Sequence, residues 1–228
     1  NTVFAHLMRR LVAERVVNLA RRLGVKSPVQ PVNSNVLGTS NVTLLDMASA
    51  YSTFANRGVY SPPSMVTRVT RMDGTPLWNW DRELERALDS KLVDQLTWVL
   101  EGTITEGTGH RAKIGRPAAG KTGTTQNYAD ALFVGYTPQV ATAVWVGYPK
   151  GQIPMVPPLT ERKVYGGTFP ALIWKDVMLA AHTDLPVKNF ATPPTSSTTT
   201  VPNRGDMIMP ELVGLTLENA KLNLKENR

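Results

Sequence analysis

The sequence contains no cysteine among its 228 residues. This absence excludes disulfide bonds, thiol catalysis and cysteine-ligated metals from the chain. It leaves the redox compartment open, because an oxidising location permits disulfides without requiring them. No apolar run reaches the roughly 18 residues that a membrane-spanning helix needs, so the sequence predicts no such helix.

Histidines are also few, and the spacing of His6, His110 and His182 does not match a metal site, so we expect neither a metal nor another cofactor. Acidic residues are outnumbered, with 18 Asp and Glu against 25 Lys and Arg, which gives a net charge of +7. No nucleic-acid-binding motif accompanies this charge. A solvated basic helix face is therefore favoured, and no nucleic-acid partner is expected.

What the sequence does have is enough apolar residues, 42% of the chain, for a folded core. Apolar spacing predicts one amphipathic helix over residues 2–23. A second helix begins at Thr43, which stands three residues before Asp46 as in a capping box. Ser90 is expected to cap a third helix, and Pro170 fits the first turn of a fourth.

β-rich segments lie between these helices. Asp73 and Gly74 predict the turn of a hairpin. Strands are expected over residues 118–125, 132–136 and 140–146, and the last two carry apolar residues on both faces. Helices first, then an antiparallel sheet, then a helix indicate an α+β fold with helices covering both faces of the sheet.

Composition divides the chain into three parts. Residues 1–182 have the composition of a folded domain, and residues 183–206 contain a Pro-, Ser- and Thr-rich stretch typical of a linker. Folded composition returns over residues 207–228, which is enough for about one strand and one helix.

The densest chemical signal lies within residues 120–125, where Lys121, Thr122, Gly123 and Thr124 follow one another on a predicted strand. A Lys ammonium, Thr hydroxyls and free backbone N–H groups together bind a carboxylate well. Glycine in a strand allows a ligand to approach closely. From the local pattern alone, a Gly- and Thr-rich edge strand with a solvent-facing Lys is equally favoured.

A phosphate-binding loop is the competing interpretation, since residues 115–122 fit the pattern G-x-x-x-x-G-K-T. That signature requires a buried strand before the loop and a helix after it. Here the preceding residues have the composition of a loop, and the following residues have that of a strand. Pro117 also removes one of the N–H donors. An NTPase is therefore disfavoured.

The K-T-G sequence at Lys121–Gly123 belongs to the motif set of penicillin-binding proteins and related β-lactamases. Residues 1–182 resemble the C-terminal part of the transpeptidase domain of a class A (bifunctional) penicillin-binding protein. The matching segments are 43–58 (TLLDMASAYSTFANRG) and 120–146 (GKTGTTQNYADALFVGYTPQVATAVWV). Leu132 departs from the family, which usually has Trp there. The resemblance implies the family's antiparallel fold, present only in part.

The same resemblance implies that Asn1 is the Asn of the family's S-x-N motif, because residues 1–7 match the helix that follows it. No Ser in the chain has a Lys three residues later, so the nucleophile's S-x-x-K motif is expected before Asn1 in the intact protein. A glycosyltransferase domain and a membrane anchor are expected there as well. Beyond the linker, Pro210 and Gly214 fit the start of a PASTA module.

The resemblance further implies a peptidoglycan D,D-transpeptidase or carboxypeptidase on the extracytoplasmic face of the bacterial membrane. Its partners would be D-Ala-D-Ala stem peptides, β-lactams and the missing N-terminal part. Lys121 and Asn1 would be catalytic, and substrate would be bound by Thr122, Gly123, Thr124 and Thr125. This chain alone is expected to be inactive. A β-lactamase, a β-lactam sensor and a non-catalytic peptidoglycan-binding fragment remain the alternatives.

Overall fold

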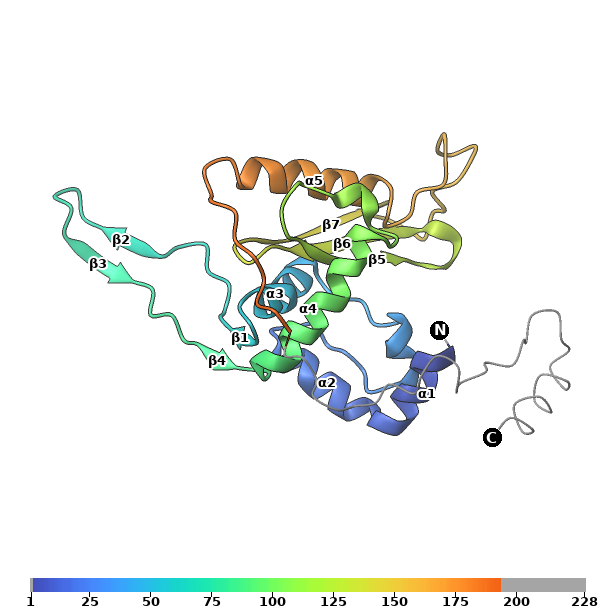
Figure 1. Ribbon diagram of the computed structural model, residues 1–228, viewed down its shortest axis with the longest axis horizontal. Coiled ribbons are helices and arrows are strands. Elements are labelled where there is room, and N and C mark those ends of the chain that lie inside the picture. The colour runs from blue at the N-terminus through green and yellow to red at the C-terminus, as the bar shows by residue number, and fades with distance from the viewer. Residues whose placement is uncertain (1, 194–228) are drawn as a thin grey trace, which may run out of the picture. The chain divides into compact units, whose positions relative to one another are not determined.

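A computed structural model describes residues 2–193 of the chain (Figure 1). Asn1, residues 194–206 of the predicted linker and the PASTA-like residues 207–228 lie outside the described part. The helices are α1 (Thr2–Leu11), α2 (Ala13–Arg22), α3 (Leu44–Ala55), α4 (Ser90–Thr105) and α5 (Phe169–Ala181), with short 3-10 turns η1 (Asn33–Leu37), η2 (His110–Ala112) and η3 (Gln126–Tyr128). The strands are β1 (Val59–Tyr60), β2 (Arg68–Thr70), β3 (Pro76–Asn79), β4 (Glu85–Arg86), β5 (Ala119–Thr124), β6 (Asp130–Tyr136) and β7 (Ala141–Gly147).

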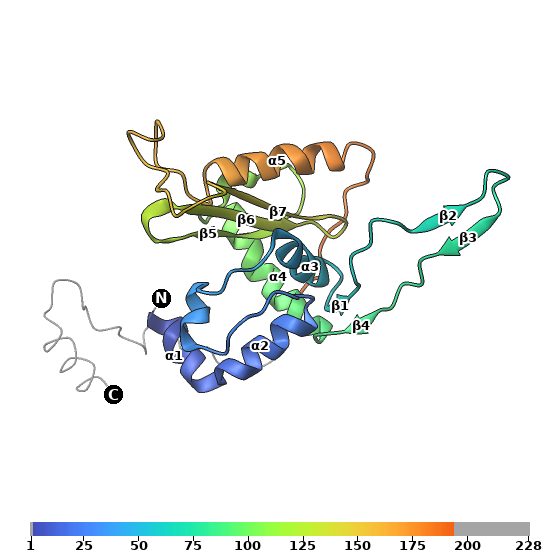
Figure 2. The same ribbon diagram turned by 180° about the vertical axis from the view of Figure 1, so that it is seen from behind.

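The centre of the fold is an antiparallel sheet of order β5-β6-β7. Helix α5 covers one face, and α3 with α4 lies on the other, as Figures 1 and 2 show from opposite sides. On the α5 face, the fully buried Trp174 packs edge-on against Phe133, with ring centroids 5.2 Å apart. On the other face, the Tyr136 hydroxyl meets Thr97 Oγ1 at 2.8 Å. The predicted α+β fold with both faces covered is confirmed.

The single helix expected over residues 2–23 is wrong, because the chain breaks at Val12, whose φ is +67°. The apolar pattern contains the reason. The buried side chains on either side of the break, Met8 and Ala13, are five residues apart, which would place them about 140° apart around a continuous helix. Two shorter helices replace it. Gly24, with φ of +103°, then ends α2 in a Schellman-type turn, in which Val25 N–H reaches Ala20 O at 3.0 Å.

Helix α3 begins with the predicted capping box. Asp46 N–H donates to Thr43 Oγ1 at 3.1 Å, and Thr43 N–H donates to Asp46 Oδ2 at 3.3 Å. The buried Asp46 carboxylate also accepts the backbone N–H groups of Lys26 and Ser27. One carboxylate thus caps its own helix and fastens the segment that follows α2.

Two further local predictions have opposite outcomes: the Asp73–Gly74 hairpin is confirmed, and the Ser90 cap is wrong. Asp73 and Gly74 form the turn between β2 and β3, with Gly74 at φ of +84°, so the hairpin is confirmed. The hairpin projects from the body of the molecule (Figure 1). Ser90 is not the cap of α4. Asp89 holds that position, and its side chain accepts the N–H of Lys91 at 2.8 Å, because a carboxylate one residue earlier reaches the free donors first.

Candidate functional site

Strand β5 is an edge strand, and its register decides where each motif residue points. Thr122 pairs with Phe133 and therefore shares the α5 face. Lys121 pairs with Val134 and points to the opposite face, where α3 and α4 pack. Thr124 follows Thr122 on the α5 side. The motif therefore places its cation and its two hydroxyls on different sides of one strand.

The backbone of β5 offers unpaired groups at its outer edge. Thr125 donates its N–H to Asp130 O at 3.0 Å, on the inner side of the strand end. Since backbone groups alternate sides along a strand, the N–H and C=O groups of Thr122 and Thr124 face the outer edge. Such an edge can hydrogen-bond an extended peptide laid antiparallel to it.

The Lys121 side chain turns toward this edge. Its Nζ donates to Thr122 O at 3.0 Å, and that carbonyl belongs to the outward-facing set. Within residues 2–193 the only ion pair joins Arg57 to Asp94, so no carboxylate of the described chain lies within 4.0 Å of Lys121. An exposed ammonium that pairs with no carboxylate of the described residues is thus held next to outward-facing backbone groups of β5.

Thr122 has a hydroxyl partner that the sequence did not reveal. Its Oγ1 lies 2.7 Å from Thr108 Oγ1 in the loop after α4. The only signal for Thr108 in the sequence is its place in a Gly- and Thr-rich loop. This contact orients the hydroxyl of Thr122 on the α5 side of the strand.

Thr124 and Gly123 meet the loop that leads into α5. Thr124 Oγ1 accepts the N–H of Gly166 at 3.1 Å, which leaves the hydroxyl proton of Thr124 available to a ligand. A Cβ on Gly166 would lie 2.7 Å from Gly123 O, so this approach requires glycine at position 166. The backbone of Gly123 is thus packed against Gly166, while its N–H and C=O groups face β6.

Thr125 ends the strand and makes mostly local contacts. Its Oγ1 accepts the N–H of Asp130 at 2.8 Å, and Asp130 Oδ1 in turn accepts the indole N–H of Trp145 at 2.9 Å. These bonds set the geometry of the β5–β6 connection. The substrate-binding role of Thr125 stays a prediction.

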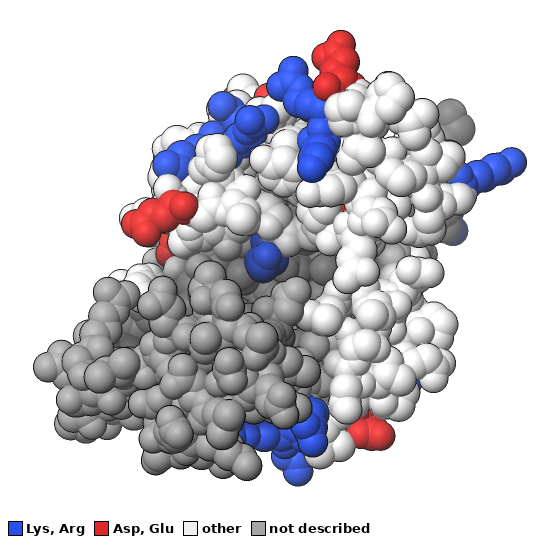
Figure 3. Space-filling view, turned by 90° about the vertical axis from the view of Figure 1, so that its right-hand side faces the viewer, with Lys and Arg blue, Asp and Glu red and all other residues white. Residues whose placement is uncertain are grey.

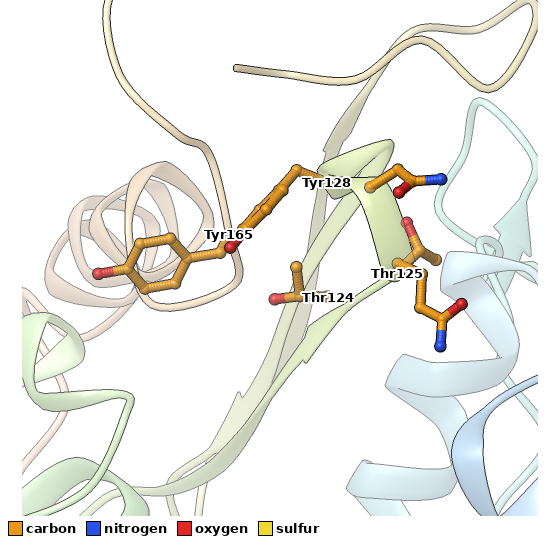
Figure 4. A pocket seen from close by; sticks show the side chains of 6 residues that line it. Thr124, Thr125, Tyr128 and Tyr165 are labelled. Atoms are coloured by element: carbon orange, nitrogen blue, oxygen red, sulfur yellow. The ribbon is translucent and has the colours of Figure 1, made fainter. Parts of the chain in front are cut away.

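A hollow of about 700 Å³ lies at this end of β5 and is shown in Figure 4. Its lining is polar and aromatic, and consists of Thr124, Thr125, Gln126, Asn127, Tyr128 and Tyr165. Asn127 and Tyr128 have φ values of +64° and +57°, a left-handed conformation that is uncommon for non-glycine residues. Asn adopts the left-handed conformation more readily than most residues, so Asn127 could have indicated a turn here. Nothing in the sequence pointed to Tyr128 or Tyr165.

The structure also decides the phosphate-loop alternative raised by the sequence. Residues 119–124 form a strand and β6 follows, so the strand–loop–helix geometry of a phosphate loop is absent here. Among residues 2–193, His, Asp and Glu side chains do not gather into a group of three or more that could hold a metal ion. None of the helices in the same residues has the length and apolar character of a membrane span. Asn1, the other predicted catalytic residue, lies outside the described part.

Comparison with known proteins agrees with this arrangement. The family model for the penicillin binding protein transpeptidase domain matches residues 1–158. Penicillin-binding protein 1A of Mycolicibacterium smegmatis is 38% identical over 170 residues, which cover 72% of this chain and 22% of the relative. Penicillin-binding protein 1A of Aquifex aeolicus is 32% identical over 195 residues, which cover 85% of this chain and 26% of that protein. The chain thus spans about a quarter of the length of these relatives.

Solved structures give the same result for the fold. The PonA1 protein of Mycobacterium tuberculosis in complex with penicillin V superposes with a TM-score of 0.74 and 32% identity, covering 83% of this chain and 55% of that one. Penicillin-binding protein 1A of Haemophilus influenzae superposes with a TM-score of 0.73 at 20% identity, covering 85% of this chain and 34% of that one. The latter likeness concerns the fold alone.

Proposed function

Since the chain belongs to the penicillin-binding protein transpeptidase family, we propose that residues 120–125 form the carboxylate-binding strand of a serine D,D-transpeptidase site. The observation that carries the proposal is the position of Lys121. Its ammonium lies at the free edge of β5, 3.0 Å from Thr122 O, with no carboxylate within 4.0 Å among the described residues. A substrate carboxylate at this edge would gain a charge-assisted hydrogen bond.

The reaction is acyl transfer from a peptide ending in D-Ala-D-Ala. A Ser nucleophile attacks the carbonyl of the penultimate D-Ala, the terminal D-Ala leaves as the amine, and an amine of a neighbouring strand then takes the acyl group. The outward N–H of Thr124 is one donor to the developing oxyanion. Thr122 and Thr124 hydroxyls bind the terminal carboxylate, and Gly123 leaves room for the acyl chain.

The nucleophile comes from a part of the protein outside this chain, because no Ser here is followed by Lys at the third position. Asn1 is the Asn of S-x-N and holds the substrate's peptide amide. Residues 1–182 are the C-terminal part of the transpeptidase domain, 183–206 its linker and 207–228 a partial PASTA module. A glycosyltransferase domain and membrane anchor place the intact protein at the outer face of the membrane.

Acylation by benzylpenicillin, followed by intact-mass spectrometry, tests the proposal. The full-length protein gains one penicilloyl mass, and residues 1–228 alone gain none. Lys121→Ala in the full-length protein slows acylation by about 10- to 100-fold, the loss expected for a hydrogen bond to a charged group. Lys91→Ala, at the far end of α4, removes an exposed cation elsewhere and leaves the rate unchanged.

Two results contradict the proposal. A penicilloyl group on residues 1–228 would place the nucleophile inside this chain. Equal acylation rates for Lys121→Ala and the unmodified protein would show that β5 is not part of the site. Slow release of penicilloate from the adduct separates a transpeptidase from a β-lactamase, which turns the drug over.

A further inference from the structure

A second hollow lies at the base of the β2–β3 hairpin, at the opposite end of β6 from the hollow in Figure 4. Its volume is about 200 Å³. Three parts of the chain line it: the C-terminal end of α3, residues 138–141 at the β6–β7 turn, and residues 59, 61 and 82 from the two legs of the hairpin. Figure 1 shows the hairpin leaving the body of the fold beside α3 and β1. A ligand in this hollow would therefore touch the hairpin and the body at once.

Arg82 is the only charged residue among the described residues that line this hollow. Its Nε donates to Ser61 Oγ at 2.9 Å, and its Cζ lies 6.0 Å from the centroid of the Trp80 ring. These two contacts orient the guanidinium. Within residues 2–193, no Asp or Glu oxygen lies within 4.0 Å of Arg82. The outer N–H groups of the guanidinium, which match the two oxygens of a carboxylate, are thus left to a ligand.

The C-terminal end of α3 forms a second wall with the opposite electrical character. The hollow meets this helix end at Ala55 and Asn56. The last carbonyl groups of a helix carry a partial negative charge. The Asn56 side chain adds to it, because its Nδ2 donates to Val59 O at 3.0 Å and its Oδ1 remains as an acceptor. This wall therefore favours an N–H donor, and the guanidinium favours an anion.

The β6–β7 turn forms the third wall, and its shape is fixed by the chain itself. Thr137 N–H donates to Val140 O at 2.9 Å. Thr137 Oγ1 accepts the N–H groups of Gln139 and Val140, each at 3.1 Å. Because these bonds do not involve a ligand, this side of the hollow is already formed before anything binds.

We propose that this hollow binds the α-carboxylate and the adjacent N–H group of one small amino acid, either free or at the C-terminus of a peptide. The carboxylate pairs with the guanidinium of Arg82, and the N–H group donates to the end of α3. The volume is somewhat larger than that of a cavity that binds benzene, so it admits one small residue. The bound residue ties the hairpin leg at Arg82 to the body of the fold. This site is separate from β5 and does not depend on the proposed function.

Other cations of the chain are alternative partners for a carboxylate. Figure 3 shows the end of the molecule that faces away from the hairpin, and several Lys and Arg side chains gather there. Lys121 on β5 is a further exposed cation. The test must therefore separate Arg82 from these groups.

Isothermal titration calorimetry of the full-length protein uses alanine, N-acetylalanine, propionate and alaninamide as probes. Propionate lacks the N–H group, and alaninamide lacks the carboxylate. Alanine is expected to bind at least about tenfold more tightly than either, since each of them loses one charge-assisted interaction. N-acetylalanine identifies the source of the ligand. Binding as tight as that of alanine assigns the C-terminus of a peptide, and absence of binding assigns a free amino acid.

Variants then locate the site. Arg82→Ala should weaken alanine binding by about 10- to 100-fold, and Arg82→Lys should recover only part of it, because one ammonium does not match both carboxylate oxygens. Arg71→Ala removes an exposed Arg of the same hairpin outside the lining and should leave binding unchanged. Lys121→Ala should also leave it unchanged. Alanine should slow amide hydrogen exchange at residues 59–61 and 80–86 in the unmodified protein and not in Arg82→Ala.

Three results would overturn the proposal. The first is the absence of alanine binding, or alanine binding that survives Arg82→Ala. The second is equal affinity for alanine and propionate, which would make the hollow a simple anion site. The third is loss of binding in Lys121→Ala, which would place the ligand at β5. None of them bears on the transpeptidase assignment, which the penicilloyl adduct tests separately.

Discussion

Thr108 and Thr122 meet hydroxyl to hydroxyl, with their Oγ1 atoms 2.7 Å apart across 14 residues of sequence. Thr122 lies on the strand that carries Lys121, and Thr108 lies in the loop after α4. The contact joins that loop to the edge of the sheet. It orients a hydroxyl that the proposed function assigns to the substrate carboxylate.

Removing the Thr108 hydroxyl should therefore weaken acylation without unfolding the protein, because Thr108 is exposed. Thr108→Ala is expected to lower the second-order rate constant for benzylpenicillin by about fivefold, the worth of one neutral hydrogen bond. Thr108→Ser keeps the hydroxyl and should restore most of the rate. Stopped-flow acylation of the full-length protein measures both. Equal rates for the two variants would show that the contact does not orient Thr122.

Asp46 should make the stability of the fold depend on pH. Burial alone raises the pKa of Asp46, but hydrogen bonds from Ser27, the Lys26 N–H and Thr43 outweigh it and lower the pKa to about 2. The folded pKa lies below the unfolded one, so this contribution is complete above about pH 4 and is lost as the pH falls toward 2. Urea unfolding across that pH range measures the loss.

Asp46→Ala tests the same carboxylate directly. It removes the cap of α3 and leaves the N–H groups of Lys26 and Ser27 without their acceptor, which should cost about 2–4 kcal/mol of unfolding free energy. It should also flatten the stability curve between pH 4 and 2. Asp176→Ala, an exposed carboxylate on α5, is the control and should change neither quantity. A variant as stable as the control would rule out the fastening role of Asp46.

Two glycines with positive φ should respond differently to the same substitution. Gly38 has φ of +79° and open space where a Cβ would stand, so Gly38→Ala costs only about 1–2 kcal/mol of backbone strain. Gly24 has φ of +103°, and its Cβ would meet the Tyr60 ring and Ser49 Oγ. Gly24→Ala should therefore destabilise the protein by at least about 1 kcal/mol more than Gly38→Ala. Thermal unfolding of the two variants compares them, and equal losses would contradict the crowding at Gly24.

The local features of this protein were determined by its sequence. The capping box of Thr43 and Asp46, the Asp73–Gly74 turn and the strand over residues 119–124 depend on neighbours within a few positions. The strand that carries the K-T-G sequence could be predicted for the same reason. The helix predicted over residues 2–23 failed because a five-residue step in its apolar stripe cannot stay on one helix face.

Only the tertiary structure decided what surrounds that strand. The hydroxyl of Thr122 meets that of Thr108, and the hydroxyl oxygen of Thr124 accepts the N–H of Gly166. The ammonium of Lys163 lies over the ring of Tyr128. These contacts join segments 14 to 42 residues apart, and no periodicity or spacing encodes them. They exist because burying Trp174 and Phe133 between α5 and the sheet brings the loops at the ends of β5 and β7 together.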